Sequence, residues 1–160
     1  MKVFVSVGTQ KFPFDRLLRL ADETAGNRPD IQFFEQTGQS GYHPEHCESK
    51  DFLNADEFGE QIQSCDLLIV HSGVGTIIKG LNLHKRIVVV PRLAQYAEHV
   101  DDHQLQIAES FADKNLVLCY QEGDNLSDLI DRAMAHSFAP YISHRKEMVT
   151  TIEEYLETLR

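Results

Sequence analysis

The sequence predicts an α/β domain in which an open, mostly parallel sheet carries helices on both faces. Short β-branched or aromatic segments alternate with amphipathic segments along the whole chain of 160 residues. Two of the short segments, DLLIV (66–70) and RIVVVP (86–91), are continuous apolar runs, which is typical of strands buried on both faces of a parallel sheet. Strands that alternate with helices in this way are joined by right-handed crossovers into one open sheet.

The expected strands are short and rich in β-branched and aromatic residues. The first, VFVSVG (3–8), ends at Gly8, and the second, IQFFEQTG (31–38), precedes the longest polar segment of the chain. That segment, QSGYHPEHCESK (39–50), contains Gly and Pro and predicts a loop. In order, we expect strands at 3–8, 31–38, 51–54, 66–70, 86–91 and 116–120.

The expected helices carry apolar residues at helical spacing. In the first helix Leu17, Leu18 and Ala21 share one face, and Gly26 predicts its end. In order, we expect helices at 14–26, 56–65, 74–83, 100–114, 125–138 and 143–159. The last helix places an apolar stripe on one face, formed by Met148, Ile152, Tyr155, Leu156 and Leu159.

Composition predicts one globular domain over residues 1–160, with 42% hydrophobic and 25% charged residues. The formal net charge of −10 disfavours general binding to nucleic acid or to anionic membranes. No apolar run is long enough to span a membrane, and the first residues do not resemble a signal peptide. Three cysteines without a CxxC pair suit a reducing, cytoplasmic location, and Cys65 and Cys119 lie in apolar contexts typical of a core.

Small residues follow two of the expected strands, at the edge of the sheet where ligands of open parallel sheets bind. Gly8 and Thr9 follow the first strand, and HSGVGTI (71–77) follows the strand at 66–70. Glycines let the backbone approach a ligand closely, and free amides at a helix N-terminus favour an anion. The segment fits neither a Walker loop nor GxGxxG. Phosphate binding and a plain serine-capped turn both remain open on this pattern.

A third segment, EHVDDHQ (98–104), follows the strand at 86–91 and concentrates acids, histidines and an amide. Such groups are suited to hydrogen bonding with a polyhydroxylated ligand. Zinc binding by His99 and His103, which stand four residues apart, is one alternative. Helix-start residues that only complement the helix dipole are another. The segment HPEHC (43–47) also resembles a metal cluster, but it lacks a second pair of ligands in the sequence, so we interpret it as a loop.

These three segments, in this order, resemble the C-terminal, donor-binding half of family 28 glycosyltransferases of the GT-B fold. The matching stretches are VSVGTQKFPFDRLL, CDLLIVHSGVGTI and KRIVVVPRLAQYAEHVDDHQLQIAE, and the resemblance covers roughly positions 2–120. The chain is similar to the small subunits of two-component enzymes, namely eukaryotic dolichyl-diphosphate chitobiose synthases and bacterial exopolysaccharide glycosyltransferases. The bacterial branch is the more similar because of EHVDDHQLQ.

The resemblance implies a Rossmann-like half of a GT-B enzyme that transfers a sugar from a UDP-sugar with inversion and without a metal cofactor. It assigns Asp102, His103 and Gln104 to the donor sugar. Lys79 stands where many relatives carry a ribose-binding Glu. For the nucleotide and its diphosphate it assigns Gly8, Thr9, Gln10, His71, Ser72, Gly73, Val74, Gly75 and Thr76.

The resemblance also implies a partner, because a GT-B enzyme places its reaction between two such domains. A membrane-anchored subunit would supply the acceptor half and recruit the chain to the inner face of the membrane. The acceptor would be lipid-linked, in exopolysaccharide or capsule synthesis. The last helix is expected either to dock this partner or to pack on its own sheet.

The general base of the transfer has three candidates by location, Glu98, His99 and Asp102, unless the partner supplies it. A non-catalytic nucleotide-sugar-binding module would share the same loops and is the main alternative function. A flavodoxin-like flavin binder ranks behind both.

Overall fold

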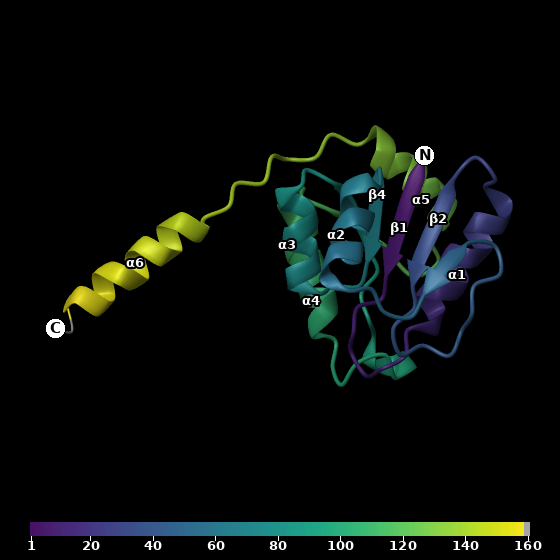
Figure 1. Cartoon of the computed structure of the whole chain (residues 1–160), viewed down its shortest axis with the longest axis horizontal. Helices are drawn as coiled ribbons and strands as arrows, with labels where there is room; N and C mark the ends of the chain where they lie inside the picture. The colour runs from purple at the N-terminus through teal and green to yellow at the C-terminus, as the bar shows by residue number, and fades with distance from the viewer. Residues whose placement is uncertain (159–160) are drawn as a thin grey trace.

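Six parallel strands form a single sheet in the order β3-β2-β1-β4-β5-β6 in the computed structural model, which describes residues 1–158 apart from the side chains of 146–149 and 155 (Figure 1). This confirms the predicted open parallel sheet. The strands are β1 (Lys2–Ser6), β2 (Gln32–Gln36), β3 (Glu48–Lys50), β4 (Leu67–Val70), β5 (Arg86–Val89) and β6 (Leu118–Cys119).

Helices cover both faces of the sheet, as the alternating pattern predicted. Buried residues of α1 and α5 form one core cluster with one face of the sheet, and those of α2, α3 and α4 form a second cluster on the other face. The helices are α1 (Asp15–Asn27), α2 (Ala55–Ser64), α3 (Val74–Asn82), α4 (His103–Asp113), α5 (Leu126–Ala135) and α6 (Arg145–Thr158), with a 3₁₀ turn, η1 (Ala94–Tyr96).

The central strands are buried on both faces, which explains their continuous apolar sequences. In β4, Leu67 and Ile69 pack in the α1 and α5 cluster, while Leu68 and Val70 pack in the opposite cluster. All four side chains are fully buried. Each contributes about 1.5–3 kcal/mol of hydrophobic free energy relative to exposure, so β4 anchors both layers.

The edge strands differ from the prediction. β3 lies at Glu48–Lys50, inside the segment predicted to be a loop, and the strand expected at 51–54 is wrong. All three residues of β3 are exposed and pair with β2 only through their backbones, so no hydrophobic pattern marks them. Asn54 instead begins α2, where it forms a capping box with Glu57. β6 is likewise shorter than the expected 116–120.

The C-terminal helix α6 projects away from the sheet at the end of an extended segment (Figure 1). Of its predicted stripe, Ile152 and Leu156 are 52% and 54% exposed, while the side chains of Met148 and Tyr155, and Leu159 as a whole, lie outside the described residues. The described residues of α6 therefore do not pack on the sheet of this domain. No helix in residues 1–158 combines the length and apolar composition needed to cross a bilayer.

Candidate functional site

Two of the predicted loops meet at the centre of the sheet. From β1 the chain builds β2 and β3 on one side and then returns to place β4 on the other, so the connections reverse direction between β1 and β4. Ligands of open α/β sheets bind at such a switch point, outside the carboxyl ends of the strands. Ser6 pairs with Val70 at these ends, which brings Gly8 and His71 side by side.

The His71 ring fills the space between two glycines. It is only 5% exposed, and a Cβ on Gly8 would overlap its Nε2 atom. A Cβ on Gly73 would lie 2.6 Å from its Cε1 atom. Gly8 also has a φ of +76°, in the left-handed region that favours glycine. Both glycines are therefore required by the packing of one imidazole ring, whatever else they do.

Hydrogen bonds fix the tautomer of this ring. The backbone N–H of Arg92 donates to Gln104 Oε1 at 3.2 Å, so the amide NH₂ of Gln104 faces His71 Nδ1 at 3.3 Å. Nδ1 is then the acceptor, and the ring proton resides on Nε2, between the two glycines. Burial, with a smaller contribution from the Arg92 charge, lowers the pKa of His71 to about 4, so the ring is neutral near pH 7.

Helix α3 begins beside His71 without a side-chain cap. Its N-cap is Gly73. Helices α1 and α4 also lack a side-chain cap, whereas α2 and α5 are capped by Asn54 and Asn125. The amides of the first turn, at 74–76, have no partner within the helix and carry the positive end of its dipole. A Cβ on Gly75 would meet no protein atom within 4 Å.

Unpaired polar side chains gather at the same strand ends. Within the part of the chain that the structure describes, Ser72 Oγ and Gln10 Oε1 are buried without a hydrogen-bond partner. Thr9 is exposed, and the Gly8 amide donates a hydrogen bond to Ser6 Oγ at 3.2 Å. We call Gly8, Gln10, His71, Ser72 and residues 73–76 the cradle. Its donors and dipole suit an anion such as a phosphate.

A buried arginine that the sequence reasoning missed holds the cradle loops together. Arg92 is fully buried, and its guanidinium donates to the carbonyl oxygens of Val7 at 2.5 Å, Phe12 at 2.7 Å and Glu98 at 3.2 Å. Burial lowers its pKa to about 10, so it stays charged at neutral pH. One signal in the sequence could have indicated this role: Arg92 is a charged residue directly after the apolar run VVVP, in the loop that follows a buried strand.

Glu98 is part of this scaffold. Its carboxylate is buried and receives two hydrogen bonds from Arg16, at 2.8 and 3.1 Å, and one from the backbone N–H of Leu93. These bonds tie α1 to the loop after β5. A carboxylate engaged in this way is poorly placed to accept a proton from a substrate, so the geometry favours a positioning role over the predicted role of general base.

The remaining residues of the third loop are more exposed. His99 Nδ1 lies 3.2 Å from Asp101 Oδ1, and Asp102 accepts a hydrogen bond from the Ala94 amide at 2.9 Å. His103 is exposed at the start of α4, whereas Gln104 is buried and its amide is engaged within the protein. Gln104 thus positions His71 and is not free for the donor sugar in this conformation. This departs from the predicted role.

Two further expectations can be compared with the geometry. Among the described residues, neither His99 nor His103 joins a group of three close metal-ligating atoms, which disfavours the zinc alternative there. Lys79 lies in α3 with its Nζ 5.1 Å from the centre of the Phe58 ring, so it packs toward α2.

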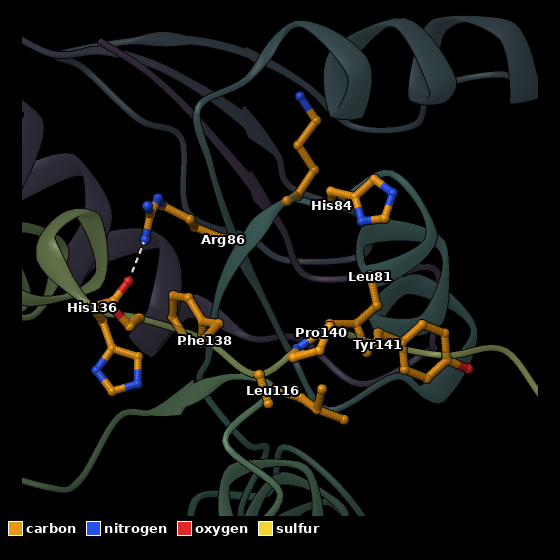
Figure 2. Close-up of a pocket in the computed structure, with 11 residues that line it drawn as sticks. Leu81, His84, Arg86, Leu116, His136, Phe138, Pro140 and Tyr141 are labelled. Atoms are coloured by element: carbon orange, nitrogen blue, oxygen red, sulfur yellow. Dashed lines mark hydrogen bonds between the residues drawn. The ribbon is translucent and has the colours of Figure 1, made fainter.

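Two pockets lie at opposite ends of the sheet and differ in the residues that line them. One of about 290 Å³ lies beside the third loop and is lined in part by Asp102 and Tyr120. Another, of about 410 Å³, is lined by Arg86 at the amino end of β5 and by residues 136–141, and none of its lining residues belongs to the cradle. Figure 2 shows this pocket. The Arg86 guanidinium in this pocket is already hydrogen-bonded to backbone carbonyl oxygens, those of Ala133 and His136. Figure 2 shows the bond to His136. We therefore exclude it as the main site.

Replacing Arg92 by Met tests the scaffold. The change leaves three carbonyl oxygens without their donor, and we expect the free energy of unfolding to fall by about 3–5 kcal/mol. Urea denaturation of Arg92→Met beside the exposed control Arg132→Met would measure this. A loss below 1 kcal/mol for Arg92→Met, or an equal loss for both variants, would contradict the assignment.

The neutral His71 ring predicts a pH dependence of stability. Its folded pKa of about 4 lies below the unfolded value of about 6.5, so the unfolded state takes up a proton first as the pH falls. Stability is therefore lost between pH 6.5 and 4, and His71 adds no dependence above that window. Between pH 7 and 5 the wild type should lose about 2 kcal/mol more than His71→Gln in urea unfolding. The exposed control His43→Gln should behave like wild type; identical losses in all three proteins would refute the prediction.

Comparison with known proteins identifies the family of the chain. Residues 2–158 match the glycosyltransferase family 28 C-terminal domain. The chain is 33% identical, over 69 residues, to the UDP-N-acetylglucosamine transferase subunit ALG13 of Candida albicans. The match covers 43% of this chain and 22% of that protein.

Solved structures share the fold. The glycosyltransferase of kitacinnamycin superposes with a TM-score of 0.63 at 20% identity, over 84% of this chain and 34% of the other. The calicheamicin glycosyltransferase CalG4 gives 0.64 at 16%, over 85% and 34%. The solution structure of ALG13 gives 0.56 at 17%, over 89% of both chains. The chain spans about a third of the first two and about a fifth of the curated relative. From the match along nearly its whole length, this chain belongs to the family of the glycosyltransferase family 28 C-terminal domain.

Proposed function

We propose that the chain is the donor-binding subunit of an inverting glycosyltransferase that uses a UDP-sugar. The observation that carries the proposal is the cradle, in which the uncapped N-terminus of α3, the unpaired buried hydroxyl of Ser72 and a neutral histidine lie at the switch point. Membership in a glycosyltransferase family supports it, and so does the similarity to a protein named as a UDP-N-acetylglucosamine transferase subunit.

Leaving-group stabilisation is the chemistry that the cradle suits. When the bond from the sugar to the nucleotide breaks, negative charge develops on the diphosphate. Amides 74–76, the Ser72 hydroxyl and the His71 Nε2–H group offer donors that are already oriented, and such donors lower the barrier without reorganisation. This arrangement needs no metal ion at the diphosphate, and it operates locally despite the net charge of −10.

The general base is best assigned to His99. Its Nδ1 lies 3.2 Å from Asp101 Oδ1 and within reach of the Asp101 amide, contacts that orient the imidazole. The ring is 19% exposed, so it can be reached from outside the domain. We place Asp102 and His103 toward the donor sugar, where exposed acceptors and donors can bind hydroxyls.

A partner completes the enzyme in this proposal. A membrane-anchored subunit supplies the acceptor half, and the acceptor is a polyprenyl-diphosphate-linked sugar in the synthesis of an exopolysaccharide or capsule. Helix α6 offers exposed Ile152 and Leu156 for docking, since it projects away from the sheet. Co-purification tests this: removing residues 143–160 should abolish partner binding by a still-folded domain, and unchanged binding would defeat the idea.

The alternative is a nucleotide-sugar-binding module without catalytic activity. It shares the cradle but predicts no turnover. Hydrolysis or transfer of a UDP-sugar on adding the membrane partner would separate the two functions.

Nucleotide binding is tested by Gly75→Val. A Cβ at this position meets no other protein atom within 4 Å, so the fold should persist. In the proposed complex, the valine side chain on the first turn of α3 would crowd a bound phosphate. We expect UDP affinity to fall at least about tenfold, a change of 1.4 kcal/mol. A thermal-shift panel of UDP-sugars gives the measurement, because a bound ligand raises the melting temperature by mass action.

The matched control is Gly59→Val, another helical glycine whose added Cβ would meet nothing nearer than Lys79 Nζ at 4.0 Å. It should bind UDP like wild type. No response of the wild type to any UDP compound, or equal affinities in Gly75→Val and wild type, would overturn the proposed function.

Catalysis by His99 predicts that His99→Gln lowers kcat by about 10²–10⁴ in the presence of the partner, with UDP affinity unchanged. Asp101→Asn should lower kcat less, because it removes only the carboxylate that contacts the imidazole. A His99→Gln enzyme with full activity and an unaltered pH profile would show that the partner supplies the base.

A further inference from the structure

A cluster on the α1 face of the sheet has no part in the proposed glycosyl transfer. Asp22 of α1, Glu35 of β2 and Cys47, just before β3, each contribute one potential ligand atom, and these atoms all lie within 4.8 Å of one another. Asp22 and Glu35 are fully buried, and Cys47 is half-buried. Three separate segments thus bring two carboxylates and a thiol to one point.

In this cluster, Glu35 has a carboxylate oxygen that no described residue of the protein satisfies. Its Oε1 lies 3.4 Å from Cys47 Sγ, whereas its Oε2 is buried without a hydrogen-bond partner among the described residues. A buried carboxylate oxygen without a partner is costly. Burial raises the pKa of Glu35 to about 8 and also raises that of Cys47. A cation among these atoms would offset both costs.

Asp22 is held as metal-ligating carboxylates usually are. It accepts hydrogen bonds from Tyr42 Oη at 2.6 Å and from the amides of Glu45 and His46 at 3.0 and 2.8 Å. The His46 ring also contacts it, with Nδ1 3.3 Å from Oδ1. Outer contacts of this kind fix the orientation of a metal ligand.

We infer that Asp22, Glu35 and Cys47 bind one divalent cation of the zinc class. The thiolate selects a borderline or soft metal over magnesium and calcium, and carboxylates complete a set that zinc accepts. Binding displaces the protons of the thiol and of the Glu35 carboxyl to solvent, and no oxidation is involved. The fourth position is left to water or to a rearranged His46.

The site would fasten a poorly anchored part of the fold. The residues of β3 are all exposed, and in the 39–50 segment Tyr42 and Cys47 are only partly buried against the core. Cys47 in that segment would be joined through the metal to α1 and β2. The inference is independent of the proposed function, since the cradle contains none of these three residues.

The test uses the whole chain, with Zn²⁺ in equilibrium dialysis and Co²⁺ as a spectroscopic probe of thiolate ligation. We expect one Zn²⁺ per chain and a near-ultraviolet thiolate-to-cobalt band. Cys47→Ser should abolish the band and weaken Zn²⁺ binding at least about tenfold. Glu35→Gln should weaken Zn²⁺ binding to a similar extent. The matched control Cys119→Ser, at a half-buried cysteine outside the cluster, should keep both signals.

Glu35→Gln guards against a folding artefact, because it removes a buried acid and keeps the side-chain shape. If Cys47→Ser does not fold, by circular dichroism, loss of Zn²⁺ from a folded Glu35→Gln still supports the site. No Zn²⁺ bound by the wild type, or binding retained in both cluster variants, would overturn it. Zn²⁺ binding retained in both variants would indicate that surface histidines bind the metal instead. UDP binding is measured separately on the metal-free protein. The metal site can therefore fail while UDP still binds, and the proposed function can fail while Zn²⁺ still binds.

Discussion

The buried guanidinium of Arg92 is the interaction on which the carboxyl edge of the sheet depends. It binds carbonyl oxygens of the β1 loop and of the loop after β5, while Glu98 in that second loop binds Arg16 of α1. Burying a cation is costly unless hydrogen bonds compensate it, and the bonds from the two terminal nitrogens of the guanidinium hold both loops in place. The backbone of Arg92 then fixes Gln104, and Gln104 fixes the His71 ring. The order of the cradle follows from this chain of contacts.

The cradle shows how an acidic protein can hold an anion. The chain carries a net charge of −10, but the groups that face the cradle are amides, a hydroxyl and a neutral imidazole. Their dipoles act over a few ångströms, whereas distant charges are screened by salt over about 10 Å. Leaving α3 without a cap forgoes about 1 kcal/mol of helix stability that Asn54 and Asn125 provide to α2 and α5.

Most of the fold and the positions of the cradle loops could be predicted from the sequence. The apolar runs at 66–70 and 86–91 determined two central strands, because a strand buried on both faces must be apolar throughout. Glycines after two strands determined where a backbone could approach a ligand. The edge strand β3 escaped prediction because its side chains are all exposed and it is defined only by backbone pairing with β2.

What the tertiary structure decided is which distant side chains meet. Nothing local in the sequence indicates that Arg92 reaches Val7, that Glu98 is consumed by Arg16, or that Gln104 faces His71, since these contacts join residues 33 to 85 positions apart. The same holds for Cys47, whose segment had no second pair of ligands until folding brought Asp22 and Glu35 beside it. Sequence patterns determine the elements through burial and backbone geometry. The roles of polar residues are set by partners that only packing brings together.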